Sequence, residues 1–271
     1  MVKKQPNKKN EEKKGLSVKK YFMPDVPGLK SLFSHGIPWG SAVLIEGGPG
    51  CGKTLFCLQS CVNACKQGKK VLFMSFEEPE DNLRSHLKMF NFDAEKYEKD
   101  GLLKIKRFNA LDIARSVEAL LSEAKKELLI DVQPVLIPKD FEPDIIFVDS
   151  LTSISSAFSG EKHRFRIYME QLFRYLESHN ITSFLIMETP HPTHLGSVIS
   201  GLDQAVSFLS DGILVIYNVI YDNGTRGRAF EILKMRGEDI KRIIVELEIK
   251  DKKGIVIYPD KPLKHKNHVL T

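Results

Sequence analysis

The sequence predicts an α/β fold, with a mostly parallel central sheet flanked by helices and antiparallel strands at its C-terminal edge. Short apolar runs that suit buried strands alternate with segments of helical periodicity between residues 43 and 187. A glycine-rich loop joins the first of these strands to the helix that follows it. Further along, strand-like runs flank two turn signals that indicate β-hairpins, Asp222-Asn-Gly-Thr225 and Asp251-Lys-Lys253.

Each expected element follows from its local pattern. Apolar runs of buried-strand length cover residues 43–45, 71–76, 102–108, 144–149 and 181–187. Apolar residues at helical spacing, or a proline at the first position of a helix, predict helices over 54–67, 79–90, 110–129 and 162–180. The hairpin signals predict strands over 212–221, 227–235, 241–249 and 254–258. Short helices are expected at 29–34 and 203–209, an irregular segment at 130–143, and a serine-rich loop at 151–161.

The composition is that of a globular protein and not of a membrane or secreted one. The 271 residues, 42% hydrophobic and 28% charged, suit one large α/β domain. No apolar run reaches the roughly 18 residues needed to cross a bilayer, and the N-terminus lacks the apolar core of a secretory signal. We therefore expect a cytoplasmic protein that does not bind membranes.

The charge distribution predicts a folded body between two tails. Residues 1–20 hold eight lysines and two glutamates, so this tail is strongly basic and the rest of the chain is nearly neutral. Such a tail is more often a solvated, disordered arm than a nucleic-acid-binding surface. We expect residues 1–20 to be disordered, 21–260 to form the folded domain, and 261–271 to be a flexible tail.

Residues 47–54 fill the pattern G-x-x-x-x-G-K-[ST] between a predicted strand and a predicted helix. Glycine at four of these positions leaves backbone N–H groups free to surround a phosphate, and the helix directs its positive dipole end at the same anion. Lys53 would reach the β- and γ-phosphates, and the Thr54 hydroxyl would ligate Mg²⁺. The sequence predicts that ATP and Mg²⁺ bind here, against Gly47, Gly48, Pro49, Gly50, Cys51, Gly52, Lys53, Thr54 and Leu55.

Acidic residues follow two of the predicted strands. Asp149 ends the strand 144–149, as in a Walker B segment, where it would hold Mg²⁺ through water. Glu77 and Glu78 follow the strand 71–76, at the sheet edge where ligands collect in open α/β folds. Adjacent strand residues point to opposite faces, so one acid would polarise the attacking water while the other supports Mg²⁺ or the loop.

The cysteines and histidines do not predict a metal centre. Cys57, Cys61 and Cys65 recur every four residues on one predicted helix, which favours packing of three small apolar thiols in the core. Cys51 lies within the phosphate loop, where a thiol near the helix dipole would be sensitive to oxidation. His191 and His194 have no third ligand nearby in the sequence.

Four segments between residues 25 and 259 belong together: the lead-in His35-Gly-Ile-Pro-Trp-Gly40, the loop Gly47–Thr54 with Leu55-Phe56, the acid pair in Phe76-Glu77-Glu78-Pro79, and Glu231-Ile-Leu-Lys-Met-Arg-Gly237. In these segments the chain resembles the RecA-fold ATPases of the KaiC and RadA group, and most of all a single KaiC-type domain. The resemblance implies a RecA-like P-loop NTPase fold, ATP hydrolysis with Glu77 as the preferred base, and a homo-oligomeric ring, a hexamer. It also implies that Lys234 and Arg236 act on the ATP of a neighbouring subunit.

The chain departs from the family pattern at three places. His35 replaces a glycine that is usual in the lead-in, and Glu238 follows Gly237 where the family often has a histidine shortly afterwards. Ser207-Phe208 stands where the phosphorylated domain of the clock protein has adjacent serine and threonine, which argues against autokinase activity. The clock protein has two such domains and this chain has one, so the resemblance does not imply a clock role.

Three biological roles fit these features. The first is an ATP-driven ring that signals through an unidentified protein partner, and the second is a RadA-like recombination accessory that binds single-stranded DNA. The third is a nucleotide-gated scaffold whose ATPase activity is incidental. Binding of single-stranded DNA would need basic or aromatic loops. Residues 150–166 offer such a loop, whereas residues 189–207 contain neither lysine nor arginine, which weakens the DNA role.

Overall fold

The computed structural model describes residues 20–124, 137–138, 140–158, 162–189, 206–263 and 268–270. The expected disordered tail (except Lys20), most of the irregular segment 130–143, and His191 and His194 lie outside these residues. The elements are β1 (Tyr21–Phe22), the 3₁₀ turn η1 (Leu29–Leu32), β2 (Ile37–Pro38), β3 (Ala42–Gly47), α1 (Lys53–Lys66), β4 (Val71–Ser75), α2 (Glu80–Met89), α3 (Ala94–Lys99), β5 (Leu103–Arg107), α4 (Ala110–Ala124), β6 (Ile145–Asp149), α5 (Leu151–Ala157), α6 (Lys162–Ser178), β7 (Thr182–Glu188), β8 (Gly212–Tyr221), β9 (Arg226–Met235), β10 (Val245–Lys250), β11 (Gly254–Pro262) and β12 (His268–Leu270).

One large sheet organises the fold. Within the described residues it has ten strands, in the order β11-β10-β9-β8-β3-β7-β6-β4-β5, with β12 paired to β8. The pairs from β8 through β3, β7, β6 and β4 to β5 are parallel, whereas β8–β9, β9–β10 and β10–β11 are antiparallel. The predicted α/β class, with its parallel centre and antiparallel C-terminal edge, is confirmed.

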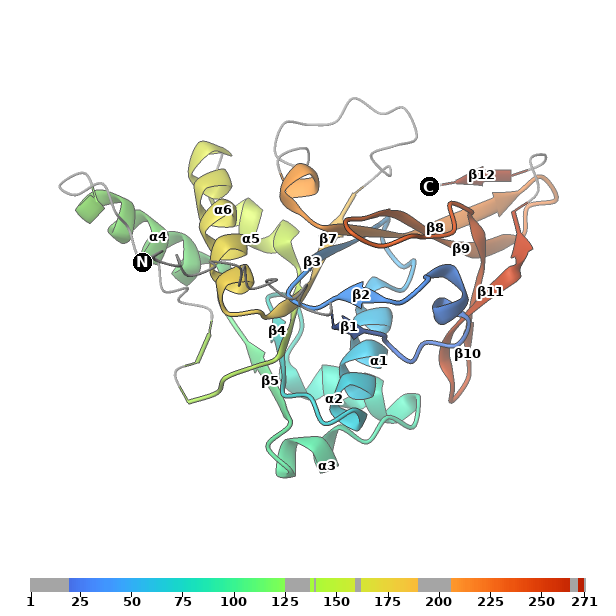
Figure 1. The fold of residues 1–271 in the computed structure, drawn as a ribbon, viewed down its shortest axis with the longest axis horizontal. Coiled ribbons are helices and arrows are strands. Elements are labelled where there is room, and N and C mark those ends of the chain that lie inside the picture. Colours follow the sequence, from blue (N-terminus) through green and yellow to red (C-terminus); the bar gives the residue numbers. More distant parts are fainter. Residues whose placement is uncertain are drawn as a thin grey trace, which may run out of the picture.

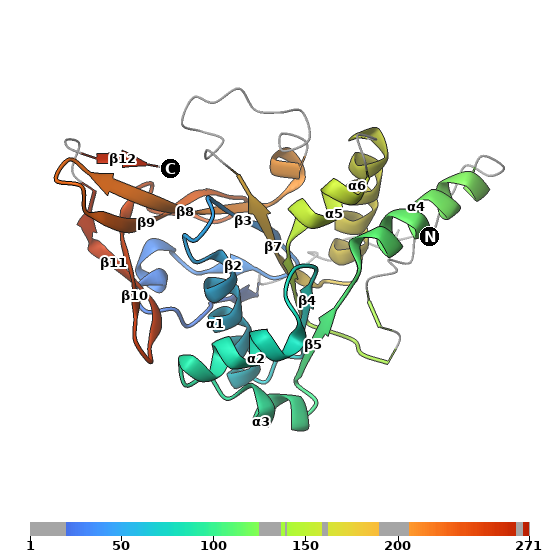
Figure 2. The same cartoon turned by 180° about the vertical axis from the view of Figure 1, so that it is seen from behind.

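Helices cover both faces of the sheet (Figures 1 and 2). Helices α1, α2 and α3 pack on one face, where Phe56 and Leu83 join the strand residues Val43 and Ile45 in a buried cluster. Helices α4, α5 and α6 pack on the other face, in a second cluster that includes Leu44. Because both sides are covered, β3 is apolar at successive positions, which is why its sequence reads as a continuous hydrophobic run.

Helix α1 carries the three cysteines on its buried side. Cys57, Cys61 and Cys65 are all free and at most 1% exposed, and they pack in the same cluster as Leu58. Burial raises the pKa of the Cys57 and Cys61 thiols well above the ordinary value. The predicted role of these residues in the core is confirmed. Among the described residues no group of three or more His, Cys, Asp or Glu side chains is placed to hold a metal ion.

The expectation of a serine-rich loop after β6 is wrong, since residues 151–157 form helix α5. The Ser150 hydroxyl accepts the backbone N–H of Ser153 and caps the first turn. Leu151 and Ile154, three residues apart, are buried against the core. An N-cap and one apolar pair thus outweigh the low helix propensity of the serines.

The ends of the described chain also pair. Strand β11 extends to Pro262, and His268–Leu270 pairs with β8 through Val269 opposite Ile220, in a region expected to be a flexible tail. At the other end, β1 and β2 form a two-stranded sheet across the lead-in before β3. None of the described helices combines the length and hydropathy that spanning a bilayer requires.

Candidate nucleotide site

The glycine loop begins where β3 ends and closes on the first turn of α1. Gly50 and Gly52 have φ angles of +71° and +112°, in the left-handed region that favours glycine. A Cβ at Gly47 would lie only 2.2 Å from the carbonyl oxygen of Ile216, so no larger residue fits without movement of β8. The glycine spacing read from the sequence therefore corresponds to real backbone constraints.

Lys53 is the buried cation of this loop. Its side chain is only 5% exposed, and Nζ donates to the carbonyl oxygen of Gly48 at 2.8 Å. The carboxylate of Glu188, the last residue of β7, lies 3.5 Å from the same Nζ. A phosphate bound by the loop would compete with both acceptors for the lysine.

Thr54 and Asp149 meet beside the loop. Thr54 Oγ1 donates to Asp149 Oδ2 at 2.8 Å. Burial raises the pKa of Asp149 to about 7; the negative charges of Glu77 and Glu78 act in the same direction, and the Thr54 hydrogen bond opposes them. A hydroxyl and a carboxylate are the oxygen ligands that Mg²⁺ prefers, and a divalent cation would offset the charge repulsion, so these residues fit the predicted metal.

The two glutamates lie in the turn between β4 and α2 and face different neighbours. Glu77 Oε1 accepts hydrogen bonds from Ser150 Oγ at 2.5 Å and from Ser153 Oγ at 2.9 Å. Glu78 lies 3.7 Å from His86 on α2, and its backbone exchanges hydrogen bonds with the Ser75 hydroxyl. The two acids diverge as expected, although the divergence comes from the turn and not from strand alternation.

A hollow of about 270 Å³ opens beside the loop. Its lining comes from the phosphate loop and the start of α1, from two acidic residues, and from two aromatic rings at the C-terminal end of α2. The lining residues are Gly50, Gly52, Lys53, Thr54, Leu55, Leu58, Glu78, His86, Phe90 and Glu188. Three predicted groups therefore meet in one place: the loop cation, the Mg²⁺ ligand Thr54 and one of the paired acids.

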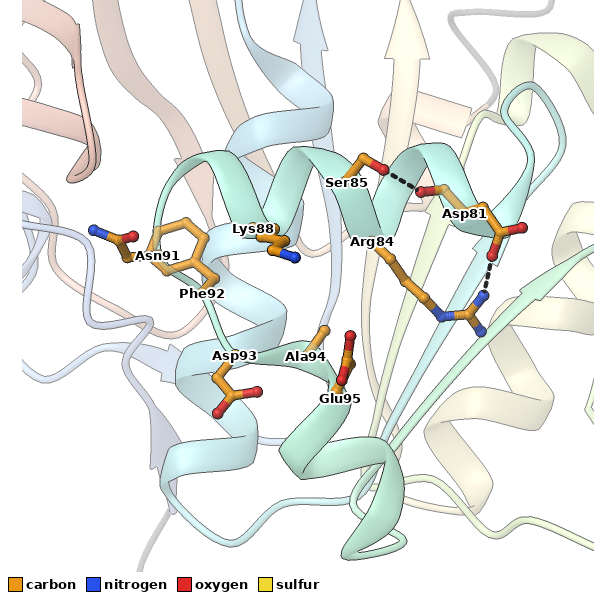
Figure 3. Close-up of a pocket in the computed structure, with 9 residues that line it drawn as sticks. All are labelled: Asp81, Arg84, Ser85, Lys88, Asn91, Phe92, Asp93, Ala94 and Glu95. Atoms are coloured by element: carbon orange, nitrogen blue, oxygen red, sulfur yellow. Dashed lines mark hydrogen bonds and ion pairs between the residues drawn. The ribbon is translucent and has the colours of Figure 1, made fainter.

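A larger hollow, of about 630 Å³, lies between α2 and α3 on the other side of α2 (Figure 3). None of its lining residues belongs to the phosphate loop. Its guanidinium, Arg84, is already bound by Glu98 and Asp81, each at 2.9 Å. Its lining includes neither the phosphate loop nor the predicted Mg²⁺ ligands, and we assign the candidate site to the smaller hollow.

Lys234 and Arg236 contact a single backbone segment within their own chain. Lys234 Nζ donates to the carbonyl oxygens of Ser207 at 3.0 Å and Ser210 at 2.5 Å. Arg236 donates to the carbonyl oxygen of Phe208 at 2.9 Å and lies 3.5 Å from Asp211. Burial, followed by the positive charge of Arg236, lowers the pKa of Lys234.

The strand register separates these two cations from the phosphate loop of the same chain. Gly212 lies opposite Val43 at the start of β3, and Met235 pairs with Gly212. The loop begins four residues later, at Gly47, which is about 13 Å further along the strand. Lys234 and Arg236 therefore lie near the N-terminal end of β3, whereas their own loop follows the C-terminal end of that strand.

Comparisons with known proteins agree with this geometry. A family model described as the KaiC ATPase matches residues 24–262. This chain belongs to the KaiC ATPase family. It is 31% identical over 247 residues to a UPF0273 protein of Aeropyrum pernix, covering 87% of this chain and 92% of that protein.

Two further relatives show the range of the KaiC family. The circadian clock protein KaiC3 of a Synechocystis species is 30% identical over 86% of this chain, which spans only 45% of KaiC3. The crystal structure of a KaiC-like protein from the hyperthermophilic archaeon Pyrococcus horikoshii superposes with a TM-score of 0.69, at 26% identity, covering 89% of this chain and all of that one. The RecA-like fold and the resemblance to a single KaiC-type domain are thus confirmed.

Sequence reasoning did not assign several residues of this site. Glu188 ends an apolar strand, as Asp149 does, and strand β7 lies directly beside β3 in the sheet. An acidic residue at the carboxyl end of a predicted buried strand indicates a ligand site, and this pattern was present at Glu188 in the sequence. Ser150 and Ser153, which hold Glu77, were hidden in a segment interpreted as a loop.

The Cys51 thiol does not have the setting expected of an oxidation-sensitive group. Its side chain is fully buried, and burial raises the thiol pKa, although the positive charges of Lys53 and Arg228 act in the opposite direction. A buried thiol with a raised pKa is a poor nucleophile. In this KaiC-family chain Cys51 fills space under the loop, 2.8 Å from where a Cβ of Gly47 would lie.

Two departures from the family pattern contact each other. The Glu238 carboxylate, 1% exposed, accepts the backbone N–H groups of His35 and Gly36 and lies 3.2 Å from His35 Nδ1. Burial of Glu238 opposes ionisation, but these hydrogen bonds lower its pKa overall. The substitution at the lead-in and the one after Gly237 therefore form one polar contact that holds the end of β9.

Proposed function

We propose that this chain binds ATP with Mg²⁺ and hydrolyses it between the subunits of a homo-oligomeric ring, a hexamer. The main support is the register of β8 and β9. With this register Lys234 and Arg236 lie near the N-terminal end of β3, whereas their own phosphate loop follows the C-terminal end of that strand. Cations with that placement are suited to the nucleotide of a neighbouring subunit. The KaiC ATPase family, to which the chain belongs, supports the choice of ATP.

The loop and its flanking residues would bind the triphosphate. Backbone N–H groups of residues 47–54 and the Lys53 ammonium would contact the phosphates, with Lys53 exchanging Glu188 for a phosphate oxygen. Thr54 and Asp149 would hold Mg²⁺, directly and through water, and the bound ion would neutralise charge on the β- and γ-phosphates.

Glu77 would polarise the attacking water. Hydrogen bonds from Ser150 and Ser153 hold its carboxylate in place, and a carboxylate can accept a proton from the attacking water. Glu78, which lines the same hollow as Lys53 and Thr54, would support the metal or the loop. The reaction needs the water in line with the γ-phosphate, so a carboxylate fixed in place is more effective than a mobile one.

Lys234 and Arg236 would complete the neighbour's site. Their present partners are neutral carbonyl oxygens and the partly exposed Asp211, which a polyphosphate carrying several negative charges can replace. A cation supplied across an interface in this way stabilises the charge of the transition state. In that arrangement neither the loop nor the cations are sufficient alone, and hydrolysis depends on assembly.

For the biological role we favour a ring that signals through a protein partner in the cytoplasm, and we do not extend the proposal to DNA. In the segment suggested for DNA contact, Arg164 is paired with Glu118 and Arg166 with Glu170. A DNA backbone would have to displace both carboxylates, and the other segment suggested for DNA contact, residues 189–207, contains no lysine or arginine. A scaffold role with incidental hydrolysis would give the same site and differ only in its partners.

The particle mass in solution tests this function. We expect light scattering to give about six times the 30.8-kDa chain mass with ATP and Mg²⁺, and a smaller value after EDTA removes the metal. Phosphate release should require the same conditions. A chain that stays monomeric with ATP and Mg²⁺ while hydrolysing ATP at full rate would contradict the shared site.

A further inference from the structure

The β8–β9 hairpin touches the phosphate loop of its own chain at two consecutive carbonyl groups. Asn218 Nδ2 on β8 donates to the carbonyl oxygen of Pro49 at 3.1 Å, and Arg228 Nη2 on β9 donates to that of Gly50 at 3.2 Å. Asn218 and Arg228 are directly opposite each other in the strand register. One rung of the ladder therefore holds two successive peptide groups of the loop.

Because the peptide group is planar, this contact also determines which way the loop's N–H groups point. In a planar trans peptide the C=O of one residue and the N–H of the next point in opposite directions. When the hairpin holds the carbonyls of Pro49 and Gly50, it directs the N–H groups of Gly50 and Cys51 away from itself. These are two of the donors with which a loop of this kind surrounds a phosphate.

The guanidinium of Arg228 also acts on the charge of the loop. A cationic donor on the Gly50 carbonyl polarises that peptide, which strengthens the Cys51 N–H as a donor to an anion. The charge of Arg228 reaches the loop, since it is among the groups that oppose the raised pKa of Cys51. Arg228 Nε is buried and has no acceptor within the described part of the chain, so the side chain keeps a further donor near the loop.

We propose that Asn218 and Arg228 are positioning residues for the phosphate loop, which hold its peptides so that the N–H groups of residues 50 and 51 face the polyphosphate of a bound nucleotide. The inference rests on the proposed function for the ligand and adds two residues that lie outside every motif of the site. It gives β9 a task within its own subunit, separate from that of Lys234 and Arg236.

Arg226 provides a matched control for Arg228. It lies two residues earlier on the same strand, is exposed, and its side chain makes no hydrogen bond or ion pair with residues 47–54 among the described residues. Arg226→Met and Arg228→Met remove the same charge and side chain, but only the second removes the hydrogen bond to Gly50. Arg228→Lys keeps the charge and one donor, and Asn218→Ala removes only the contact with Pro49.

The experiment measures displacement of a fluorescent ATP analogue by ATP and by inorganic tripolyphosphate, with the full chain and Mg²⁺. We expect Arg228→Met to lower the affinity for both competitors about tenfold, as loss of a charged hydrogen bond does. Arg226→Met should stay within about twofold of wild type, and Arg228→Lys should recover part of the loss. Asn218→Ala should weaken both competitors about threefold. Because tripolyphosphate has no adenine, weaker binding of tripolyphosphate would show that the substitution acts on the contacts with the phosphates.

The outcomes separate this inference from the proposed function. If wild type binds ATP and Arg228→Met binds as well as Arg226→Met, the positioning role is overturned and the function stands. If Arg228→Met unfolds before it can be assayed, Asn218→Ala decides: unchanged affinity for both competitors overturns the role, and a loss supports it. If wild-type protein binds neither ATP nor tripolyphosphate, the proposed function itself is contradicted.

Discussion

The two ends of β9 carry cations with different partners. At one end Arg228 contacts the phosphate loop of its own chain, at Gly50. At the other end Lys234 and Arg236 contact the carbonyls of residues 207–210, across the sheet from that loop. The difference follows from strand register alone, because β9 runs antiparallel to β8 and β8 runs parallel to β3. Under the proposed function β9 has a cis end at Arg228 and a trans end at Lys234 and Arg236, and each can be disrupted separately.

Loss of the loop cation is expected to have the largest effect. In Lys53→Ala the buried ammonium is removed, so we expect ATP affinity to fall by about 100-fold or more and hydrolysis to be abolished. Titration calorimetry with ATP and Mg²⁺ measures this. Lys66→Ala, at the exposed end of the same helix, is the control and should bind as wild type. Unchanged affinity in Lys53→Ala would contradict nucleotide binding at the loop that Arg228 contacts.

Removing the charge of Glu77 should separate binding from turnover. In Glu77→Gln the hydrogen bonds from Ser150 and Ser153 have an oxygen to bind, but the proton acceptor is lost. We expect kcat to fall by up to about 10⁴-fold with ATP affinity retained, measured by phosphate release and calorimetry. Glu95→Gln, at an exposed position of α3, is the control. If Glu78→Gln loses turnover and Glu77→Gln does not, the base assignment moves to Glu78.

Glu188 should act against nucleotide binding. Its carboxylate, 44% exposed, is paired with Lys53, so Glu188→Gln removes a competitor of the phosphates. An ion pair that exposed is worth at most about 1 kcal/mol, and we expect ATP affinity to rise by up to about fivefold. Glu177→Gln, at an exposed position of α6, should leave the affinity unchanged. Weaker ATP binding in Glu188→Gln would mean that Glu188 serves the nucleotide instead of competing with it.

The smallest effect is expected just beyond the C-terminal end of β9, at Glu238, in the pH dependence of stability. The folded-state pKa of Glu238 is lowered, so its contribution is present above the ordinary value of 4.5 and is lost as the pH falls through the lower folded value. Glu238→Gln should therefore be less stable than wild type at pH 7, with a difference that shrinks below about pH 4.5. Urea unfolding across this range measures it. If the stability difference between wild type and Glu238→Gln did not change with pH, the contact of His35 with an ionised Glu238 would be contradicted.

The sequence predicted the fold and the glycine loop between β3 and α1 well, for a physical reason. Buried parallel strands are apolar on both faces, and a phosphate loop needs glycine at fixed positions, so both leave a strong local pattern. Helix α5 was missed because its stability comes from one N-cap and two buried side chains, Leu151 and Ile154, which a serine-rich sequence does not reveal.

Contacts between distant segments were not predictable in this way. Asn218 and Arg228 reach Pro49 and Gly50 across more than 160 residues, and Glu238 reaches His35 across 203. None of these pairs leaves a periodic signal, since each depends on sheet order and register. The sequence flagged His35 and Glu238 singly as departures, and only the fold shows that they are partners.

Mixing two inactive variants tests the trans end of β9, and with it the shared site, most directly. We expect Arg236→Ala to lower kcat about 10³-fold, and Arg242→Ala, at an exposed position six residues later, to leave it unchanged. In equal mixtures of Arg236→Ala and Lys53→Ala chains, verified as mixed rings, about a quarter of interfaces pair an intact Lys53 on one chain with an intact Arg236 on its neighbour, so hydrolysis should return to about a quarter of wild type. If verified mixed rings show no activity above the separate variants, the two ends of β9 do not serve different ATP sites.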